Sequence, residues 1–377
     1  MIYLDAAATT FQKPRTVSKA VERAFHYMTT PGRGGYPAAK LAAETLFRCR
    51  SEAAQLFGAP NEEAVVFTTN ATHALNIAIK TLVHPGDHVV VSGYEHNAVM
   101  RPLYGMKTVH IHKASAPLFD QDEILRNFAE LITSDISCVI CTHVSNVFGF
   151  ILPIEKIALL CRERNVPLII DASQSAGILP VNLRSSGAAF IAMPGHKGLY
   201  GPQGTGILLC ATEAVPLIEG GTGSMSANME MPEFLPDRLE AGTQNVCGIA
   251  GLLEGIRFVR KTEVHKIEKY ERELIHFLQA GLCALPELIV YGSKTGQNQS
   301  GVLSFAVKDT DCEQVASYLA KRGIAVRAGL HCAPCAHETA GTLNCGTVRV
   351  SVSAFNTEQE IRVFLGVIKE FLIRKDA

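Results

Sequence analysis

Short apolar runs alternate with longer amphipathic stretches as far as residue 210. The runs are rich in β-branched residues and end in polar or glycine-rich turns, so each one predicts a strand. They lie at 64–68, 88–92, 136–142, 166–171, 188–193 and 204–210. Stretches with helical spacing of apolar residues lie between them, for example at 72–83 and 154–165. Strands that alternate with helices need crossover connections, so the pattern predicts a mostly parallel sheet with helices on both faces.

The pattern changes near residue 256, where a long charged helix is predicted over 256–282. Further strands are predicted at 288–292, 301–307 and 347–353, and further helices at 311–322 and from residue 357 onward. This mixture is typical of a second, smaller α/β domain. With 377 residues, the chain is long enough for two domains. We therefore predict a large cofactor-binding domain over 14–255 and a small domain built from 1–13 and 256–377.

Charge and composition narrow the kinds of partner. The chain has 35 Lys and Arg residues against 36 Asp and Glu residues, which gives a net charge of −1. This balance provides no electrostatic reason to expect a nucleic-acid partner. No run approaches ~18 uninterrupted apolar residues, and the first residues do not resemble a secretory signal. We expect a cytoplasmic protein without a membrane partner, in which the 11 cysteines are reduced thiols.

Two polar clusters follow predicted strands, and the carboxyl ends of strands are where α/β sheets bind ligands. The segment TTNATHALN (68–76) ends a strand and begins a helix near Thr72. Free N–H groups at such a helix start bind phosphate, although an ordinary helix cap would look the same. Asp171 closes the apolar run at 166–171. Its carboxylate could pair with a protonated ring nitrogen or cap the segment that follows.

Two further clusters contain a lysine and a histidine. Lys197 lies in GHKGLYGPQGTG (195–206), where glycines allow other groups to approach closely. A lysine amine forms Schiff bases with carbonyl compounds, and pyridoxal phosphate enzymes pair such a lysine with an aspartate. The alternative is a solvated loop lysine. His96 in YEHNAVMRP (94–102) could lie against a planar ring or be an exposed loop histidine.

Seven motifs follow one another along the chain: YEHNA, THVSNVFG, DASQSAG, GHKGLYGPQGTG, EAGTQN, RAGLHCAP and VRVSVSAFNT. Together they resemble the class V aminotransferase superfamily of fold-type I pyridoxal phosphate enzymes, and within it the cysteine desulfurase and selenocysteine lyase group. The resemblance runs from LDAAATT to the final helix. It implies pyridoxal 5'-phosphate as cofactor and a mostly parallel seven-stranded sheet with helices on both faces. It also implies a smaller C-terminal α/β domain that carries the cysteine loop.

The resemblance implies a role for each matching residue around the cofactor. Lys197 would hold the cofactor as a Schiff base and act as the catalytic base. His96 would stack on the ring, Asp171 would pair with the pyridine nitrogen, and Gln174 would contact the ring hydroxyl. The phosphate contacts would be Ala71, Thr72, His196 and, from the second subunit of a homodimer, Thr243.

The resemblance also implies that Asn146, Arg349 and Arg327 bind the carboxylate of an amino-acid substrate. Two positions depart from the family pattern. Pro194 stands where the family often has a serine or threonine, and Ala71 stands where a hydroxyl residue is common. The phosphate would therefore depend more on backbone N–H groups and on Thr243.

The segment RAGLHCAPCAHETAGT (327–342) permits several interpretations. It could be a loop with incidental cysteines, or a redox dithiol outside a thioredoxin-like context. It could also bind metal through Cys332, Cys335, Cys345 and a histidine, although a second CxxC pair is missing. The resemblance instead makes Cys332 the nucleophile that takes up sulfur, with Arg327 and His331 nearby to favour its thiolate. No metal is expected, and Cys335 lies outside the family motif.

These assignments predict one reaction and leave several rivals. We expect a cysteine desulfurase that converts L-cysteine to L-alanine and transfers sulfur to Cys332 as a persulfide, for delivery to a sulfur-acceptor protein. A selenocysteine lyase would use the same residues, but selenium could leave without Cys332. A cysteine-sulfinate or other β-elimination enzyme is a further rival. A non-catalytic metal or persulfide carrier is the alternative from another class, and it would need no cofactor.

Overall fold

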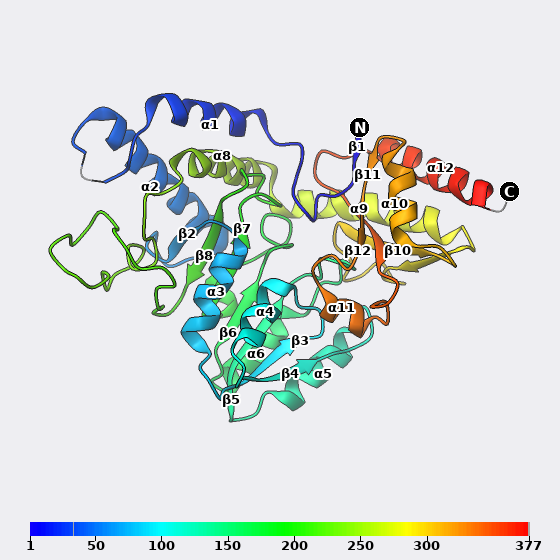
Figure 1. Ribbon diagram of the computed structural model, residues 1–377, viewed down its shortest axis with the longest axis horizontal. Coiled ribbons are helices and arrows are strands. Elements are labelled where there is room, and N and C mark those ends of the chain that lie inside the picture. The colour runs from blue at the N-terminus through cyan, green and yellow to red at the C-terminus, as the bar shows by residue number, and fades with distance from the viewer. Residues whose placement is uncertain (33, 376–377) are drawn as a thin grey trace.

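The computed structural model describes residues 1–32 and 34–375, and its larger sheet has seven strands (Figure 1). Their order across the sheet is β2-β8-β7-β6-β5-β3-β4. The strands are β2 (Val65–Thr68), β3 (His88–Ser92), β4 (His110–Ala114), β5 (Ile136–Thr142), β6 (Leu168–Asp171), β7 (Phe190–Pro194) and β8 (Gly206–Cys210). The pairings from β7 to β4 are parallel, whereas β8 is antiparallel to β7 and β2. The predicted mostly parallel seven-stranded sheet is confirmed.

Strand β4 is the member of this sheet that the hydrophobic pattern misses. Its sequence, HIHKA, is mostly polar and contains no continuous apolar run. It lies at the edge of the sheet and pairs with β3 alone. A strand that is half-exposed in this way lacks the signal by which the buried parallel strands are found.

Each face of the larger sheet is covered by its own helices, because alternate residues of a strand point to opposite faces. On β5, Val139 and Cys141 belong to one buried cluster, whereas Cys138 and Ile140 belong to another. The first cluster is completed by α2 (Pro37–Phe57), α5 (Gln121–Leu131), α6 (Ile154–Glu163) and α8 (Val246–Thr262). The second cluster is completed by α3 (Ala71–Leu82) and α4 (Asn97–Gly105). The predicted arrangement of helices on both faces is therefore confirmed.

A second sheet has four antiparallel strands in the order β12-β13-β10-β9. The strands are β9 (Leu288–Tyr291), β10 (Val302–Val307), β12 (Arg327–Gly329) and β13 (Thr347–Ser351). A separate core joins this sheet to α9 (Val264–Cys283), α10 (Cys312–Ala320) and α12 (Glu358–Lys375). The N-terminal strand β1 (Ile2–Tyr3) pairs with β11 (Ile324–Ala325), so the first residues join the C-terminal part of the molecule.

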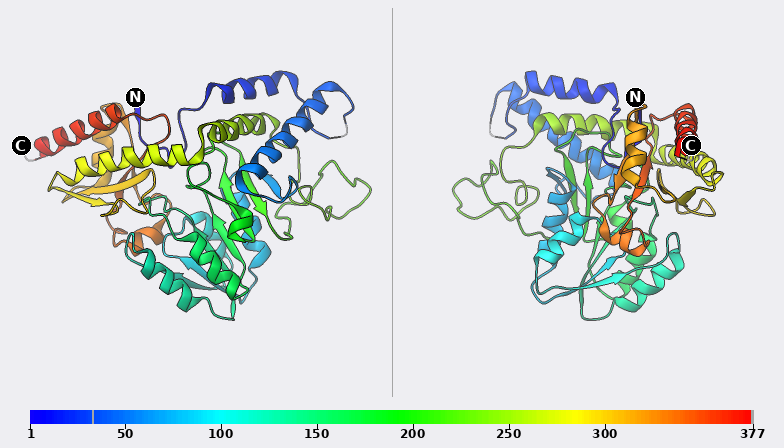
Figure 2. Two further views of the ribbon diagram at one scale, coloured as in Figure 1. Left: turned by 180° about the vertical axis from the view of Figure 1, so that it is seen from behind. Right: turned by 45° about the vertical axis from the view of Figure 1, so that its right-hand side comes forward.

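The single helix predicted over 256–282 is wrong. The chain forms two helices, α8 and α9, which are separated at Glu263, where φ is +73°. The residues on either side, Thr262 and Val264, are β-branched and have low helix propensity. The Glu263 carboxylate pairs with Lys266 in the first turn of α9 (2.9 Å). Figure 2 shows α8 beside the larger sheet and α9 continuing toward the smaller one.

The remaining helices lie at the periphery. Helix α1 (Arg15–Tyr27) packs against α8, α7 (Leu183–Ser186) is a single turn before β7, and α11 (Pro334–Thr339) follows the cysteine loop. Within residues 1–32 and 34–375, none of the helices is both long enough and apolar enough to cross a membrane.

Candidate active site

The carboxyl ends of the central parallel strands border one cavity of about 210 Å³. Thr142, Asp171 and Ala192 are neighbours in the register of β5, β6 and β7, so the residues after them lie close together. Eight of the predicted site residues line this cavity: Ala71, Thr72, His96, Asn146, Asp171, Gln174, His196 and Lys197. The structure thus brings together side chains from five separate segments of the sequence at the edge where α/β sheets bind ligands.

Lys197 lies in the turn that follows β7. The Tyr200 N–H donates to the Lys197 carbonyl (2.9 Å), and a Cβ on Gly198 would lie 2.4 Å from the Ala176 carbonyl oxygen. Glycine is therefore required beside the lysine. Burial lowers the pKa of the Lys197 amine to about 8, and the Asp171 carboxylate opposes this shift. An amine with this pKa is partly unprotonated near neutral pH, as a nucleophile or base must be.

Asp171 and His96 reach the cavity from different strand ends. Asp171 is 2% exposed, and its Oδ1 accepts the Ser173 N–H (2.9 Å). The His96 Nδ1 accepts the Ala98 N–H (3.0 Å) at the start of α4, so the ring proton lies on Nε2. Burial, followed by the charge of Lys197, lowers the pKa of His96 to about 4. His96 is therefore a neutral ring at physiological pH, suited to stacking.

The start of helix α3 forms another wall of the cavity. The Asn70 Oδ1 accepts the His73 N–H (2.9 Å), while in the described structure the N–H groups of Ala71 and Thr72 bond to no acceptor. These free donors at a helix N-terminus suit an anion. His196 lies nearby and is held through its Nδ1 by the Thr9 hydroxyl (3.0 Å).

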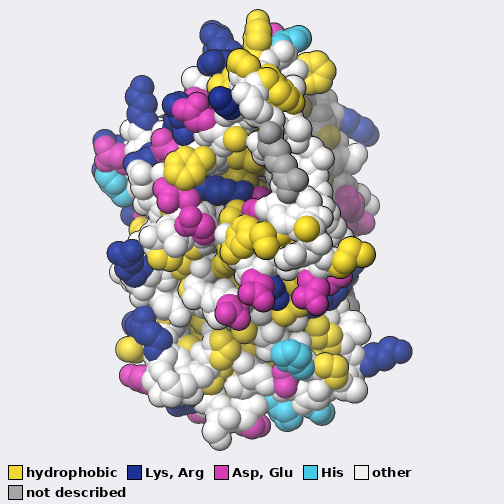
Figure 3. Space-filling model, turned by 90° about the vertical axis from the view of Figure 1, so that its left-hand side faces the viewer, with side chains coloured by type: hydrophobic (Ala, Val, Ile, Leu, Met, Phe, Trp, Pro, Cys, Tyr) yellow, Lys and Arg dark blue, Asp and Glu magenta, His cyan; other side chains and the backbone are white. Residues whose placement is uncertain are grey.

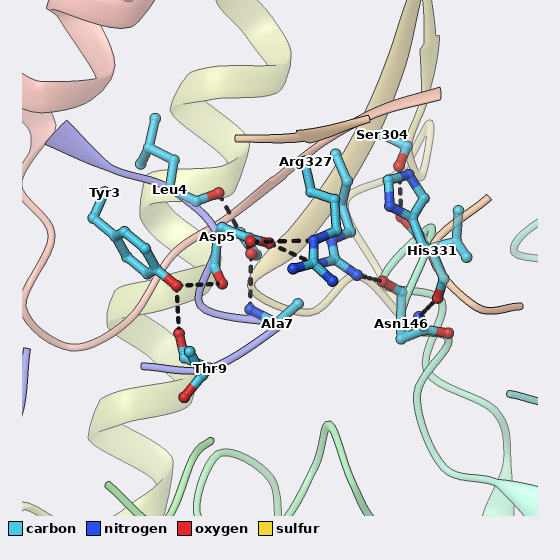
Figure 4. A network of polar contacts seen from close by, with 12 residues as sticks. Tyr3, Leu4, Asp5, Ala7, Thr9, Asn146, Ser304, Arg327 and His331 are labelled. Atoms are coloured by element: carbon cyan, nitrogen blue, oxygen red, sulfur yellow. Dashed lines mark hydrogen bonds and ion pairs between the residues drawn. The ribbon is translucent and has the colours of Figure 1, made fainter. Parts of the chain in front are cut away.

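Arg349 is buried beside the cavity, with a side chain that is 2% exposed. It belongs to a polar network with Asp5, Asn146 and Arg327, three residues that Figure 4 labels. One Nη pairs with the Asp5 carboxylate (2.7 Å), and the other donates to the Asn146 carbonyl (3.0 Å). Burial lowers the pKa of Arg349, and Asp5 opposes that change. Arg327 reaches the other oxygen of Asp5 (3.3 Å). Of the described polar atoms, the Arg349 Nε and the Asn146 Oδ1 are buried without partners, so both have capacity to bind a ligand.

The cysteine loop is fixed to residues of the cavity through its backbone. The Cys332 carbonyl accepts the Asn97 N–H (2.8 Å), next to His96, and the His331 carbonyl accepts the Asn146 side-chain amide (2.8 Å). His331 and Cys332 both have φ near +50°, in the left-handed region that non-glycine residues rarely adopt. The Cys332 side chain is exposed and does not line the cavity itself. This strained turn presents the thiol at the surface beside the cavity.

The second cysteine of the loop differs from the exposed Cys332 in its burial. Cys335 is buried, with its sulfur 3.9 Å from the Ser92 carbonyl, and burial raises the pKa of its thiol to about 11.

The proposal that His331 favours the Cys332 thiolate through its charge is wrong. Burial lowers the pKa of His331 to about 2, and its Nε2 lies 3.2 Å from Thr347, so the ring is neutral. Arg327 is the remaining cation of the two.

The Aminotransferase class-V family profile matches residues 2–364. The chain belongs to the class V aminotransferase family. A Mycolicibacterium paratuberculosis protein named probable cysteine desulfurase is 34% identical over 98% of this chain, which spans 55% of that protein's length. A Methanothermobacter thermautotrophicus protein of the same name is 33% identical over 98% of this chain and 94% of its own length. The apo structure of a cysteine desulfurase from Thermococcus onnurineus NA1 superposes with a TM-score of 0.91 at 31% identity. It covers 98% of this chain and 94% of that one.

In this class V aminotransferase, two acidic residues that the sequence interpretation missed support the site. Asp5 joins the two arginines described above. Glu95 is fully buried, and its Oε1 accepts the Thr142 N–H (2.7 Å) and the Ser92 hydroxyl. Burial raises the pKa of Glu95 to about 8, so it is mostly protonated at neutral pH. Asp5 lies in LDAAATT and Glu95 lies in YEHNA. A charged residue inside such a motif is the signal by which the sequence could have identified both.

Thr243 does not line the main cavity. It lies on a separate cavity of about 130 Å³ together with Thr205 and His73. Its implied role was in a neighbouring subunit, which a single chain does not test, so that role stays a prediction. Pro194, in contrast, does line the main cavity and contributes no hydroxyl there.

The residues present fit pyridoxal phosphate, the cofactor of class V aminotransferases. The cavity has free helix N–H groups at one wall, a carboxylate at a strand end, a neutral imidazole and a lysine amine of lowered pKa. These are the chemical partners of a phosphate, a protonated ring nitrogen, a ring face and an aldehyde. The donor set therefore matches each part of the cofactor.

Proposed function

We propose that this class V aminotransferase is a cysteine desulfurase, which converts L-cysteine to L-alanine and keeps the sulfur on Cys332 as a persulfide. The observation that carries the proposal is the placement of Cys332. Its exposed thiol lies on a loop whose backbone bonds directly to Asn97 and, through His331, to Asn146 at the cavity. The relatives named cysteine desulfurase support the same assignment.

Lys197 and Asp171 would hold pyridoxal phosphate together with His96, Gln174 and the start of α3. When bound, the cofactor supplies an aldehyde for amines and a ring that withdraws electrons from the substrate α-carbon. The His196 ring is also neutral, because burial lowers its pKa to about 4. Phosphate binding would therefore use N–H donors of α3 rather than a histidine charge. Thr243 of a second subunit would add a hydroxyl.

The substrate carboxylate would bind Arg349 and Asn146. Arg349 is held in place by Asp5, and its Nε has no partner among the described residues. The Asn146 side chain lines the cavity and donates to the His331 carbonyl of the cysteine loop. Arg327 would add a second, half-exposed positive charge at the same end. Lys197 would then remove the α-proton, since its lowered pKa leaves an unprotonated fraction near neutral pH.

The sulfur step would use the Cys332 thiolate as nucleophile. A sulfur–sulfur bond forms between Cys332 and the substrate, and the substrate carbon–sulfur bond breaks. The electron pair of the broken bond stays on the substrate β-carbon, which takes up a proton and becomes the methyl group of alanine. Lys197 would then return a proton to the α-carbon. A sulfur-acceptor thiol would later remove the sulfur from Cys332.

Lys197→Ala tests the lysine, and Cys332→Ser tests the nucleophile. In Lys197→Ala, alanine production from cysteine should fall to background, and borohydride should no longer fix the cofactor to the chain. In Cys332→Ser, mass spectrometry of cysteine-treated protein should show no added sulfur atom, because a hydroxyl is a far weaker nucleophile than a thiolate. Sulfur found on Cys335 with Cys332 unlabelled would contradict the assignment. Release of selenide from selenocysteine without cysteine turnover would instead indicate a lyase.

We further propose a cytoplasmic homodimer with a small domain formed by 1–13 and 256–377. The face that carries α1, α2 and the irregular segment 211–245 exposes large apolar side chains (Figure 3). They include Phe25, Tyr27, Phe47, Ile218, Met225 and Met229. Large apolar side chains exposed on one face are typical of an interface between protein chains. Sedimentation should give twice the mass of 40.7 kDa, and a monomer that binds the cofactor tightly would contradict the proposal.

A further inference from the structure

A buried carboxyl group without partners lies next to the turn of Lys197. A cavity of about 20 Å³ is bordered by Lys197, Gln174, Tyr200 and, from α9, Glu271. Glu271 is 1% exposed, and within the described residues neither of its oxygens has a hydrogen-bond partner. A void of this size accommodates about one water molecule. Glu271 has no role in the reaction proposed above.

No cation among the described residues is paired with Glu271. The other titratable groups at this small cavity are Tyr200 and Lys197, and of these two only Tyr200 shifts the pKa of Glu271, which it lowers. Ser300 and Gly301, just before β10, form the opposite wall, and a Cβ on Gly301 would lie 2.6 Å from the Glu271 Oε2. Among the described ion pairs, none involves Glu271, including those on α8, α12 and the strands that pack against α9. Burial raises the pKa of Glu271 to about 8, so the group is mostly neutral at pH 7.

Tyr200 connects this carboxyl group to Lys197. Its N–H closes the turn by donating to the Lys197 carbonyl (2.9 Å), and its φ of +54° is rare for a non-glycine residue. Its hydroxyl accepts the Ala354 N–H (3.0 Å), which leaves the O–H proton free to be donated. Glu271 lies beside that hydroxyl and raises the pKa of Tyr200, whereas Tyr200 opposes the increase that burial causes in the pKa of Glu271. The buried ring thus ties the Lys197 turn to α9 and to the segment after β13.

We propose that Glu271 is a positioning residue for Lys197, which supports the Lys197–Tyr200 turn while its carboxyl is protonated and destabilises it once the carboxyl ionises. This inference rests on the proposed catalytic role of Lys197. Protonated, the carboxyl group is uncharged and fits a dry site with space for one water. After its proton has left to solvent, an unpaired charge would lie next to the turn, and its hydration would require the packed walls of the small cavity to separate.

The first test follows the carboxyl group directly and needs no turnover. Infrared difference spectra of the apo-protein, recorded across a pH titration, should show the carbonyl stretch of a buried protonated acid that disappears near pH 8. Because Glu95 is also buried and has a pKa raised to about 8, it contributes to the same band. The Glu271 contribution should be lost in Glu271→Gln and kept in Glu273→Gln, a matched control on the same helix whose side chain is 62% exposed. An unchanged band in Glu271→Gln would overturn the proposal.

The second test measures the effect on Lys197. The kcat for alanine formation is measured in Glu271→Gln and in the wild type at each pH. The ratio of the variant to the wild type should rise about tenfold between pH 7 and pH 9. One pH unit above its pKa, a carboxyl is only ~10% protonated. Tyr200→Phe, which keeps the ring and removes the hydroxyl, should show a ratio that also changes with pH. Ratios constant across pH would overturn the positioning role. An absence of turnover in every protein would refute the proposed function, and the infrared result would still decide whether Glu271 is protonated.

Discussion

Asp5→Asn tests whether the site depends on one buried ion pair. The exchange keeps the size of the side chain and an acceptor oxygen for Arg349, but it removes the negative charge. Arg349 is 2% exposed and Asp5 is 12% exposed, so their pairing across 2.7 Å is largely shielded from water. Removing one partner from a buried pair leaves an uncompensated charge and costs about 3–5 kcal/mol. Because the amide oxygen still accepts a hydrogen bond, we expect a loss near the lower end, about 3 kcal/mol.

Arg327→Gln provides the matched control for this prediction. Arg327 contacts the same carboxylate at 3.3 Å, but its side chain is 49% exposed. Exposed ion pairs contribute about 0–1 kcal/mol, so this variant should lose at most ~1 kcal/mol. Urea unfolding of the apo-proteins, followed by circular dichroism, measures both changes through the shift in midpoint at constant slope. Equal losses of unfolding free energy in the two variants would refute the claim that burial makes the Asp5–Arg349 pair more stabilising than the exposed one.

Asp5→Asn should also weaken the proposed binding of the substrate carboxylate by Arg349. A guanidinium that has lost its anchor would bind the cysteine carboxylate less well, so KM for cysteine should rise more than kcat falls. About 1.4 kcal/mol of lost binding corresponds to a tenfold change. An increase in KM of about tenfold or more in Asp5→Asn, with a smaller change in Arg327→Gln, is the expected outcome. An unchanged KM would show that Asp5 stabilises the fold without orienting Arg349 toward substrate.

Two further predictions concern a thiol and a buried acid. Cys335→Ala should still accumulate sulfur on Cys332 in a single turnover, as seen by mass spectrometry, because Cys335 is buried and burial raises its pKa to about 11. Burial also raises the pKa of Glu95 from 4.5 to about 8, so its contribution to stability is complete below 4.5 and is lost as pH rises toward 8. Glu95→Gln should therefore gain stability relative to the wild type across that interval in urea unfolding, and a constant difference would contradict the assignment.

The hydrophobic pattern predicted the buried parallel strands well, because strands covered on both faces are continuous apolar runs. It missed β4, whose HIHKA sequence contains no continuous apolar run. It also joined α8 to α9 across Glu263, because a charged residue fits an exposed helix surface. For Glu263, tertiary context decided the conformation. The left-handed φ of that residue cannot be inferred from helical periodicity alone.

Site residues to which a motif assigns a role were predicted from the sequence. Buried residues that support the site from behind were not. Glu271 shows the difference. It lies one turn before Leu274 and Ile275, and these residues with Leu278 form the buried stripe of α9. The helical spacing therefore places Glu271 on the apolar face of α9. Because the same helix contains many other charged residues, this acid does not stand out in the sequence. A charged residue in phase with an apolar stripe is the signal that could have identified it.

The three histidines of the site limit where its charge can come from. Burial lowers the pKa of His96 and His196 to about 4 and that of His331 to about 2, so none carries charge near neutral pH. Recognition of a substrate carboxylate must then rely on the arginines, and Arg349 is the buried one that Asp5 anchors. The same burial leaves the Lys197 amine with a pKa of about 8. Desolvation thus removes charge from the rings that lie near the cofactor and makes the lysine a base. It leaves charge on the arginines because a guanidinium keeps its proton even when buried.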